Sequence, residues 1–434
     1  MAQSKSDTGL KMHSLCKELF PICRSITGDG FRQSLAVLQK QLPALRFFEV
    51  ATGTQCFDWT VPKEWNIADA YIIDPNGNKI CDFKQSNLYV VGYSTPVNKR
   101  VSLEELQDHL YSLPEQPTAI PYVTSYYKER WGFCITHAQR SGLPEGEYQV
   151  VIDSRLEEGF LTYGELIIPG ESEQEVFLST YLCHPSMANN ELSGPVVTTF
   201  LAKWLESLSN RKYTYRVVII PETIGSITYL SHHYKTMQDK MIAGFNVSCV
   251  GDDRTYSYLP SRDGDTLADQ VAVHTLKHIY PNFDRYTYLD RGSDERQYCS
   301  PGIDLPVCSI MRSKYGCYPE YHTSLDDLSL VTPSGLFGAF NALQKSIQCI
   351  EMNEVLQLSV LCEPQLGKRG LYPTISTKNS VTEVRDMMNL LAYCDGKHSA
   401  LEIADIIDCP LWELSSVLDK LKEEGILKAV MVAN

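Results

Sequence analysis

Residues 176–194 read Val-Phe-Leu-Ser-Thr-Tyr-Leu-Cys-His-Pro-Ser-Met-Ala-Asn-Asn-Glu-Leu-Ser-Gly, and this stretch decides the fold. The apolar and β-branched run 176–182 predicts a buried strand, and a helical pattern begins near Leu192. His184 therefore lies on a strand-to-helix loop, where ligand sites of α/β sheets are usually found. A lone histidine could equally be a hydrogen-bonded structural residue, so the rest of the chain must decide between these readings.

Length and composition define the class of protein. A chain of 434 residues with 43% hydrophobic content predicts two or three globular domains. Its 14 cysteines are scattered without a Cys-x-x-Cys pair, which favours reduced, buried thiols. We find no apolar leader and no run of roughly 18 apolar residues, so the sequence predicts a cytoplasmic protein that does not contact membrane. The net charge of −14 argues against nucleic acid as a partner.

The pattern of strands and helices changes along the chain and predicts four segments. Residues 1–56 and 158–350 show the βα alternation of an α/β domain with a mixed sheet flanked by helices. Residues 57–157 contain short strand-like runs separated by turn residues, which indicates an inserted β-rich domain. Residues 351–434 resemble a winged helix.

Polar residues recur where later strands end. Glu222 follows the strand-like run 216–220, Asp252 follows 245–250, and His322 lies in a polar loop further on. Each acid alone is more often structural or solvated. Together, two histidines and several carboxylates form the ligand set that zinc prefers, with a glutamate left to act as base.

These motifs, in this order, resemble the co-catalytic zinc aminopeptidases, a superfamily that includes glutaminyl cyclases. His184 matches the first metal histidine of that superfamily, and Asn190-Glu191-Leu192-Ser193-Gly194 matches its Asp-Asn-x-Ser-Gly. Glu222 matches its general base, Asp252 its later acidic ligand and His322 its final histidine. Runs 57–62 and 122–134 resemble a smaller group, bacterial aminopeptidase-like proteins of unassigned function with a β-rich insertion and a C-terminal winged helix.

Two departures from the superfamily pattern bear on the metal. Asn190 stands in place of the bridging aspartate, and Thr223 stands in place of a ligating glutamate. A neutral amide bridges two dications poorly, and threonine is not a usual zinc ligand. We therefore expect one zinc per chain rather than two, held by His184 and His322 with a further ligand from Asp252, Glu191 or Asn190.

The resemblance implies a zinc-dependent hydrolase that cleaves an amide bond in a small peptide or aminoacyl conjugate. Glu222 would take a proton from water. The expected lining of the substrate pocket is Asp294, Glu295, Arg296 and Tyr298, with Arg296 able to grip a substrate carboxylate. The alternative is a catalytically inactive scaffold that acts through protein–protein contacts.

The acidic charge of the C-terminal segment argues against DNA binding. Residues 380–434 hold ten acids against five bases, and the expected recognition helix opens Leu411-Trp412-Glu413. Such a surface offers little to phosphates or guanines. We expect protein contacts from this segment, with homo-oligomer formation through the insert or the winged helix as one possibility.

Overall fold

A computed structural model describes residues 2–371 and 378–430. It divides the chain into two units, which are described separately below. The first comprises residues up to 269 together with 283–341, and the second comprises residues 270–282 together with 342 onward. All of the residues predicted to form the site belong to the first unit.

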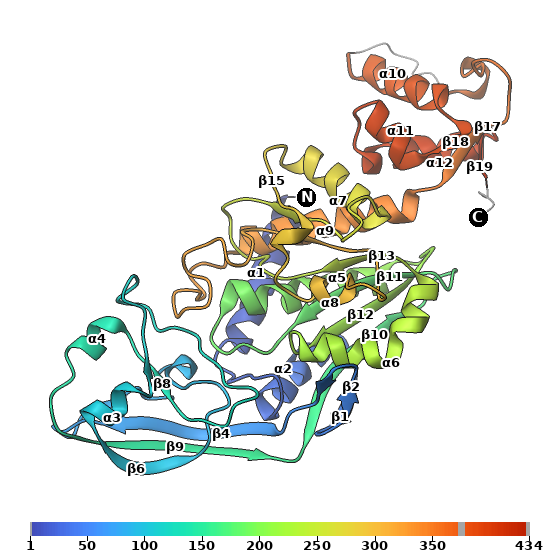
Figure 1. The fold of residues 1–434 in the computed structure, drawn as a ribbon. Helices are drawn as coiled ribbons and strands as arrows, with labels where there is room; N and C mark the ends of the chain where they lie inside the picture. The colour runs from blue at the N-terminus through green and yellow to red at the C-terminus, as the bar shows by residue number, and fades with distance from the viewer. Residues whose placement is uncertain (1, 372–377, 431–434) are drawn as a thin grey trace. The chain divides into compact units, whose positions relative to one another are not determined.

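An eight-stranded mixed sheet forms the centre of the first unit (Figure 1). Its order is β1-β10-β12-β11-β13-β16-β14-β15, with parallel pairing from β12 through β11 and β13 to β16. The strands are β1 (Arg46–Ala51), β10 (Phe160–Ile168), β11 (Glu175–Tyr181), β12 (Thr214–Ile220), β13 (Met241–Asn246), β14 (Ser257–Leu259), β15 (Asp284–Arg285) and β16 (Val307–Met311). Every residue of β11 is buried, because strands pair on both of its edges and helices cover the sheet.

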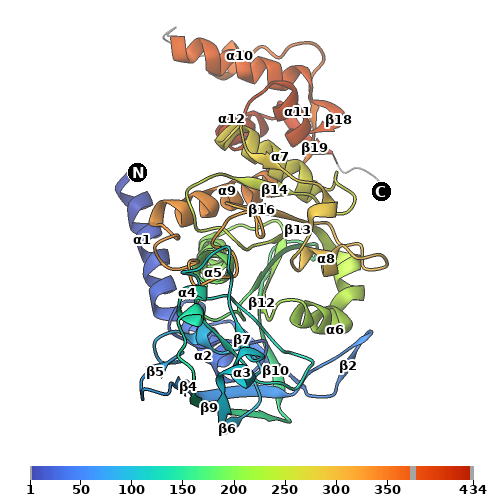
Figure 2. The ribbon, with the colours of Figure 1, turned by 60° about the vertical axis from the view of Figure 1, so that its left-hand side comes forward.

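Helices flank this sheet (Figures 1 and 2). Helix α1 packs against α5, while α2 and α6 pack against β10. The helices of this unit are α1 (Ala2–Leu19), α2 (Asp29–Gln39), α5 (Ser193–Ser207), α6 (Ile224–Lys240) and α8 (Glu295–Tyr298). Helix α9 (Pro333–Met352) begins in the first unit and ends in the second. A single π-helical turn, η2 (Ala188–Leu192), leads directly into α5.

The β-rich insertion is built on a four-stranded sheet of order β5-β4-β9-β6. The insertion has an apolar core of its own, in which Ile72, Phe133, Tyr148 and Val150 are fully buried. The elements of this region are β2 (Gln55–Cys56), β3 (Trp59–Thr60), β4 (Glu64–Ile73), β5 (Lys79–Ile80), η1 (Asn87–Tyr89), β6 (Val97–Ser102), α3 (Leu103–Gln107), β7 (Leu110–Tyr111), β8 (Phe133–Cys134), α4 (His137–Ser141) and β9 (Glu147–Glu157).

The second unit contains a three-stranded sheet of order β18-β17-β19 with short helices. A capping box between Ser399 and Glu402 starts α11. The elements of this unit after α9 are β17 (Val355–Leu358), η4 (Gly367–Arg369), α10 (Lys378–Ala392), β18 (Asp395–Ser399), α11 (Ala400–Ile406), η5 (Leu411–Glu413), α12 (Ser415–Glu423) and β19 (Leu427–Val430). Residues 270–282, which include most of α7 (Leu267–Ile279), group with this unit, which the sequence pattern did not indicate.

The predicted fold class is confirmed as a mixed α/β sheet flanked by helices, with a β-rich insertion and a C-terminal winged helix. One strand is shorter than expected: β13 ends at Asn246, and Cys249 adopts a φ of 53° that no strand permits. The exact segment boundaries at 56, 157 and 350 stay predictions. Among the described residues, none of the helices is both long and apolar enough to span a bilayer.

Candidate active site

His184 and Glu222 follow two neighbouring parallel strands. Strands β11 and β12 pair in register at Tyr181 and Ile220, so the residues that follow them emerge side by side at the carboxyl edge of the sheet. The His184 Nε2 atom lies 3.6 Å from the nearer carboxylate oxygen of Glu222. The sequence therefore correctly predicted that these two chemical groups meet.

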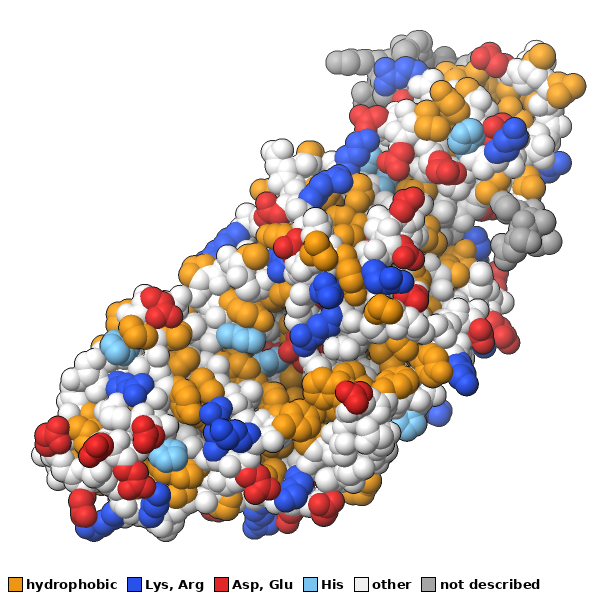
Figure 3. Space-filling view, in the orientation of Figure 1, with side chains coloured by type: hydrophobic (Ala, Val, Ile, Leu, Met, Phe, Trp, Pro, Cys, Tyr) orange, Lys and Arg blue, Asp and Glu red, His pale blue; other side chains and the backbone are white. Residues whose placement is uncertain are grey.

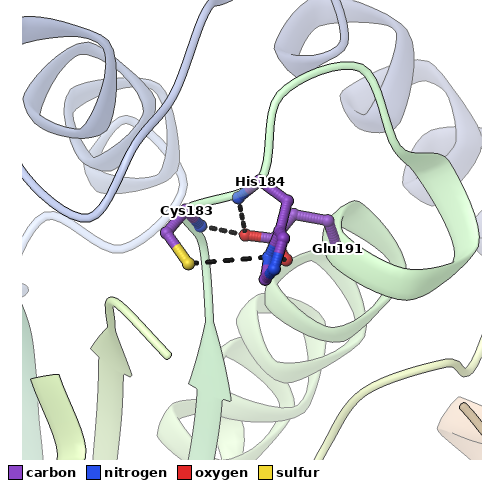
Figure 4. Close-up of side chains that lie close together, drawn as sticks. All are labelled: Cys183, His184 and Glu191. Carbon is purple, nitrogen blue, oxygen red and sulfur yellow. Dashed lines mark hydrogen bonds and ion pairs between the residues drawn. The ribbon is translucent and has the colours of Figure 1, made fainter. Parts of the chain in front are cut away.

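Glu191 fixes the orientation of the His184 ring (Figure 4). One carboxylate oxygen accepts hydrogen bonds from the backbone N–H groups of Cys183 and His184, the latter at 2.5 Å, and the other lies 2.6 Å from His184 Nδ1. When Nδ1 carries the only proton of the ring, Nε2 has a free lone pair directed toward Glu222. This is the carboxylate–histidine arrangement that commonly supports a metal ligand.

The turn that carries Asn190 and Glu191 is held by Asp326, which the sequence analysis missed. The Asp326 carboxylate accepts hydrogen bonds from the backbone N–H groups of residues 188, 189 and 190, at 2.6–3.2 Å. Tyr318 donates a further bond at 3.0 Å. Burial raises the pKa of Asp326 to about 6, although the backbone donors oppose this shift.

A buried arginine supports the same loop from the other side. Arg24 is only 1% exposed, and its guanidinium donates to the backbone carbonyl of His184 at 2.9 Å and to that of Leu19 at 2.7 Å. Burial lowers the pKa of Arg24, while the charge of Glu191 opposes this effect. The N-terminal segment thereby fixes the backbone of the histidine.

His322 approaches from a loop 138 residues further along the chain. Its ring centroid lies 5.3 Å from that of His184, and its Nε2 atom is buried without a hydrogen-bond partner. Its backbone has a φ of 56°, and its carbonyl accepts a 2.9 Å bond from Tyr122 of the insertion. Burial and then the charge of His184 lower the pKa of His322 to about 3, so this imidazole is neutral.

The residue after Glu222 has an unusual backbone that neighbouring polar groups stabilise. Thr223 has φ 63° and ψ −76°, a costly conformation for a β-branched residue. Its N–H donates to Asp294 at 2.8 Å, and its hydroxyl accepts from Arg296 at 2.6 Å. Burial, reinforced by the charge of Glu222, raises the pKa of Asp294 to about 8. These contacts direct the Glu222 side chain toward His184.

His184 and Glu222 line a pocket of about 270 Å³. Burial raises the pKa of Glu222, and the charge that His184 carries when it is protonated opposes this shift. Tyr126 of the insertion forms part of the wall, and its hydroxyl is hydrogen-bonded to that of Tyr122 at 2.7 Å. Tyr122 packs edge-on to His184, with ring centroids 4.8 Å apart. The other lining residues are Ile26, Trp59, Tyr127, Cys183, Thr223 and Ile224.

Of the other two predicted ligands, Asp252 is engaged by protein groups, whereas Asn190 keeps a free side-chain oxygen. Asp252 accepts bonds from Asn189 and from the backbone and hydroxyl groups of Ser313, at 2.9–3.0 Å. Asn190 donates to Tyr181 at 3.2 Å, while its own carbonyl oxygen is buried without a partner.

Two residues predicted to line the substrate pocket face the protein interior instead. Glu295 is fully buried and accepts from Gly292, Ser293, Asn246 and Tyr315. Tyr298 is also fully buried, with its hydroxyl 2.6 Å from that of Ser179. Asp294 and Arg296 affect the pocket indirectly, because both form hydrogen bonds with Thr223, which lines it.

The donor set fits one metal ion better than two. A buried imidazole nitrogen without a partner is unfavourable, and a metal ion would satisfy His322 Nε2. The other donors with free lone pairs are Nε2 of His184, the carboxylate of Glu222 and the side-chain oxygen of Asn190. Both oxygens of Glu191 support His184, and Asp252 is engaged in the protein, so the carboxylates for a second ion are missing.

A second cluster, His274, His278 and Asp405, lies in the second unit. It does not offer a comparable site. His274 Nδ1 lies 2.8 Å from Asp405, and His274 Nε2 accepts a 3.0 Å bond from the backbone of Leu411, so both ring nitrogens are used. This histidine joins α7 to the winged helix.

Replacing Glu191 should weaken metal binding without removing a ligand. In Glu191→Gln, the amide cannot accept from His184 and from both backbone N–H groups as a carboxylate does, so the ring loses its fixed orientation. We expect zinc affinity to fall roughly 10–100-fold. Competition titration with a chromophoric chelator measures this, with the exposed Glu206→Gln as control. An unchanged affinity would show that Glu191 does not support the ligand.

Replacing Asp326 should destabilise the first unit. An asparagine at this position presents N–H groups to backbone donors, leaving at least one of them buried and unsatisfied, so we expect a loss of about 3 kcal/mol. The matched control is Asp327→Asn, which alters only the bonds to Ser329. Urea unfolding followed by tyrosine and tryptophan fluorescence measures the difference. Equal stability of the two variants would contradict the role of Asp326.

Comparison with solved structures identifies the class of fold. A zinc aminopeptidase from Bacillus subtilis aligns with a TM-score of 0.56 at 12% identity, covering 79% of this chain and 94% of that one. A Shewanella amazonensis protein named a peptidase M28 precursor aligns with a TM-score of 0.57 at 13% identity, covering 84% and 97%. The fold is therefore that of the zinc aminopeptidases.

The chain belongs to the family described as Domain of unknown function (DUF4910), which matches residues 13–353. Residues 353–429 match the family described as winged helix-turn-helix. A Clostridium acetobutylicum protein is 44% identical over 99% of this chain and 98% of its own length, and its name assigns it provisionally to polysaccharide biosynthesis with an aminopeptidase-like domain. A crystal structure from that organism, provisionally named a peptidase, aligns with a TM-score of 0.92 at 44% identity, covering 99% and 98%.

These relatives confirm the predicted resemblance to the zinc aminopeptidases and to the aminopeptidase-like proteins with a C-terminal winged helix. Arg24, Asp326 and Tyr122 were missed by the sequence analysis. Arg24 and Asp326 each lie in a polar loop, and no spacing rule relates them to His184. Tyr122 is one of several tyrosines in a run that resembled the insertion, so composition alone does not single it out.

Proposed function

We propose that this protein is a hydrolase, dependent on one zinc ion per chain, that cleaves an amide bond in a small peptide or aminoacyl conjugate. The observation that carries this proposal is the group formed by His184, Glu222 and His322. Two imidazole nitrogens with free lone pairs lie near a largely buried carboxylate at the carboxyl edge of the sheet. The aminopeptidase fold supports the reading, because it carries peptidases among its members.

His184 and His322 would hold the zinc, with a carboxylate or the Asn190 carbonyl oxygen as a further ligand. When bound, the ion supplies a Lewis acid that polarises a carbonyl and acidifies a water molecule. The proposed base is Glu222, which takes a proton from the attacking water as the new carbon–oxygen bond forms. It then delivers this proton to the leaving nitrogen as the carbon–nitrogen bond breaks, giving a carboxylic acid and an amine, between which the last proton passes to leave a carboxylate and an ammonium group. Thr223, with Asp294 and Arg296, positions Glu222.

The substrate belongs on the side of the pocket lined by the insertion. Trp59, Tyr126 and Tyr127 offer aromatic surfaces next to His184. The Clostridium relative combines an aminopeptidase-like domain with a name that refers to polysaccharide biosynthesis. An amide carried by a sugar is therefore one member of the proposed substrate class.

Metal analysis together with an activity screen tests this function. Protein purified without chelators should contain about one zinc per chain by elemental analysis. It should hydrolyse at least one member of a panel of aminoacyl amides, dipeptides and N-aminoacyl amino sugars, and chelation should abolish this activity. A metal-free protein would contradict the proposal. A zinc-loaded protein that leaves the whole panel intact would favour the inactive scaffold.

We propose that the winged helix makes protein contacts, including contacts between copies of the chain, and does not bind nucleic acid. Its excess of acidic residues supports this proposal. Full-length protein should show no measurable affinity for a duplex DNA near physiological salt. Binding that persists under these conditions would overturn it.

A further inference from the structure

A second groove adjoins the catalytic pocket. It has a volume of about 400 Å³, and Trp59 lines both spaces. One wall comes from the β2–β3 hairpin and the other from α6 and the loop that follows α8. Figure 3 shows hydrophobic side chains gathered on this face around α6 and β2. The groove is thus an extension of the proposed active site.

The groove combines open aromatic rings with polar groups. Phe57 is 49% exposed and Trp59 is 39% exposed, and Phe57 packs edge-on to Tyr234 with ring centroids 5.7 Å apart. Asp58, Gln297 and Ser300 also line the groove. Large exposed aromatic side chains next to a catalytic pocket are typical of ligand-binding surfaces.

The backbone conformation of Phe57 also indicates a ligand-binding surface. Phe57 occupies the turn of the hairpin with a φ of 54°, a conformation that favours glycine or asparagine over an aromatic residue. Such strain is often found where a side chain serves a ligand. In this turn, the strained residue contributes its ring to the groove.

We propose that this groove is a subsite for a sugar ring, so that the amide cleaved in the neighbouring pocket is carried by an amino sugar. A pyranose has an apolar face of C–H groups and a rim of hydroxyls. The exposed rings of Phe57 and Trp59, together with the half-buried ring of Tyr234, match the apolar face, and Asp58, Gln297 and Ser300 match the hydroxyl rim. An apolar peptide side chain would instead be better buried in an enclosed pocket without polar groups. This inference rests on the proposed hydrolase function for the chemistry, whereas the binding of a sugar does not depend on it.

Binding of N,N′-diacetylchitobiose to the full-length protein tests the subsite directly. Saturation-transfer NMR should detect contact with the sugar, and titration should give a dissociation constant of the order of 1 mM. Trp59→Ala and Phe57→Ala should each weaken binding about tenfold, because each removes a ring from the sugar face. Phe160→Ala, an exposed aromatic outside the groove, is the matched control and should leave the affinity unchanged.

Two further outcomes separate the subsite from the hydrolase. If the disaccharide binds through Trp59 and Phe57 while no amide is cleaved, the sugar subsite stands and the proposed hydrolase activity fails. If leucinamide is hydrolysed while the disaccharide gives no saturation transfer, the hydrolase stands and the sugar subsite is wrong. Binding that neither aromatic substitution weakens would also overturn the subsite.

Discussion

Glu222→Gln should lower the turnover number roughly 10²–10⁴-fold on any amide that the wild-type protein cleaves. Glutamine keeps the size and hydrogen-bonding reach of glutamate but cannot accept the proton from the attacking water. The Glu222 carboxylate lies 3.6 Å from His184 Nε2, two residues after the buried strand β12, so the substitution removes the proposed base. Steady-state kinetics on the zinc-loaded variant measure the effect.

The zinc content of the same variant assigns the role of Glu222. If Glu222 acts only as the base, Glu222→Gln should keep its zinc, and the exposed Glu206→Gln should behave as wild type. Loss of zinc together with activity would show that Glu222 is a metal ligand, because an amide oxygen is a weaker donor than a carboxylate. Turnover that stays at the wild-type level would contradict both roles.

His322→Ala should lower zinc affinity by more than about 100-fold, which exceeds the effect of removing an outer hydrogen-bond partner. The reason is that His322 Nε2 is buried, neutral and without a protein partner, so a metal ion is the group that it is suited to hold. Elemental analysis after dialysis against zinc-free buffer should then return almost no metal. We expect activity to be lost in parallel.

His232→Ala, which removes an exposed imidazole on α6, is the control for this experiment. Circular dichroism and the unfolding temperature show whether His322→Ala remains folded. If the alanine variant is unfolded, His322→Gln fills most of the space and supplies a weaker donor, and it should also lose zinc. Full zinc retention in a folded His322 variant would overturn the proposed ligand.

The sequence predicted the class of fold and the location of the site from local patterns. The apolar run before His184 and the similar run before Glu222 each predicted a buried strand, and the structure has β11 and β12 there as parallel neighbours. Because parallel strands place their carboxyl ends at one edge, strand assignment alone was enough to bring these two side chains together. The winged helix in residues 351–434 was predicted for a similar reason, because its helices and turns follow from local sequence patterns.

Only the tertiary structure decided which polar side chains form hydrogen bonds with one another. Asp252 and Glu191 were equal candidates as metal ligands, yet Asp252 is bonded to Ser313 and Asn189, and Glu191 is bonded to His184. Asp326, which lies 136 residues after Asn190, supports the turn through backbone groups. The periodicity of a sequence reports which face of an element is buried, whereas the partner of a carboxylate depends on loops from distant parts of the chain. Those loops are placed by the packing of the whole unit, so hydrogen-bond partners across them follow from the fold and not from local sequence.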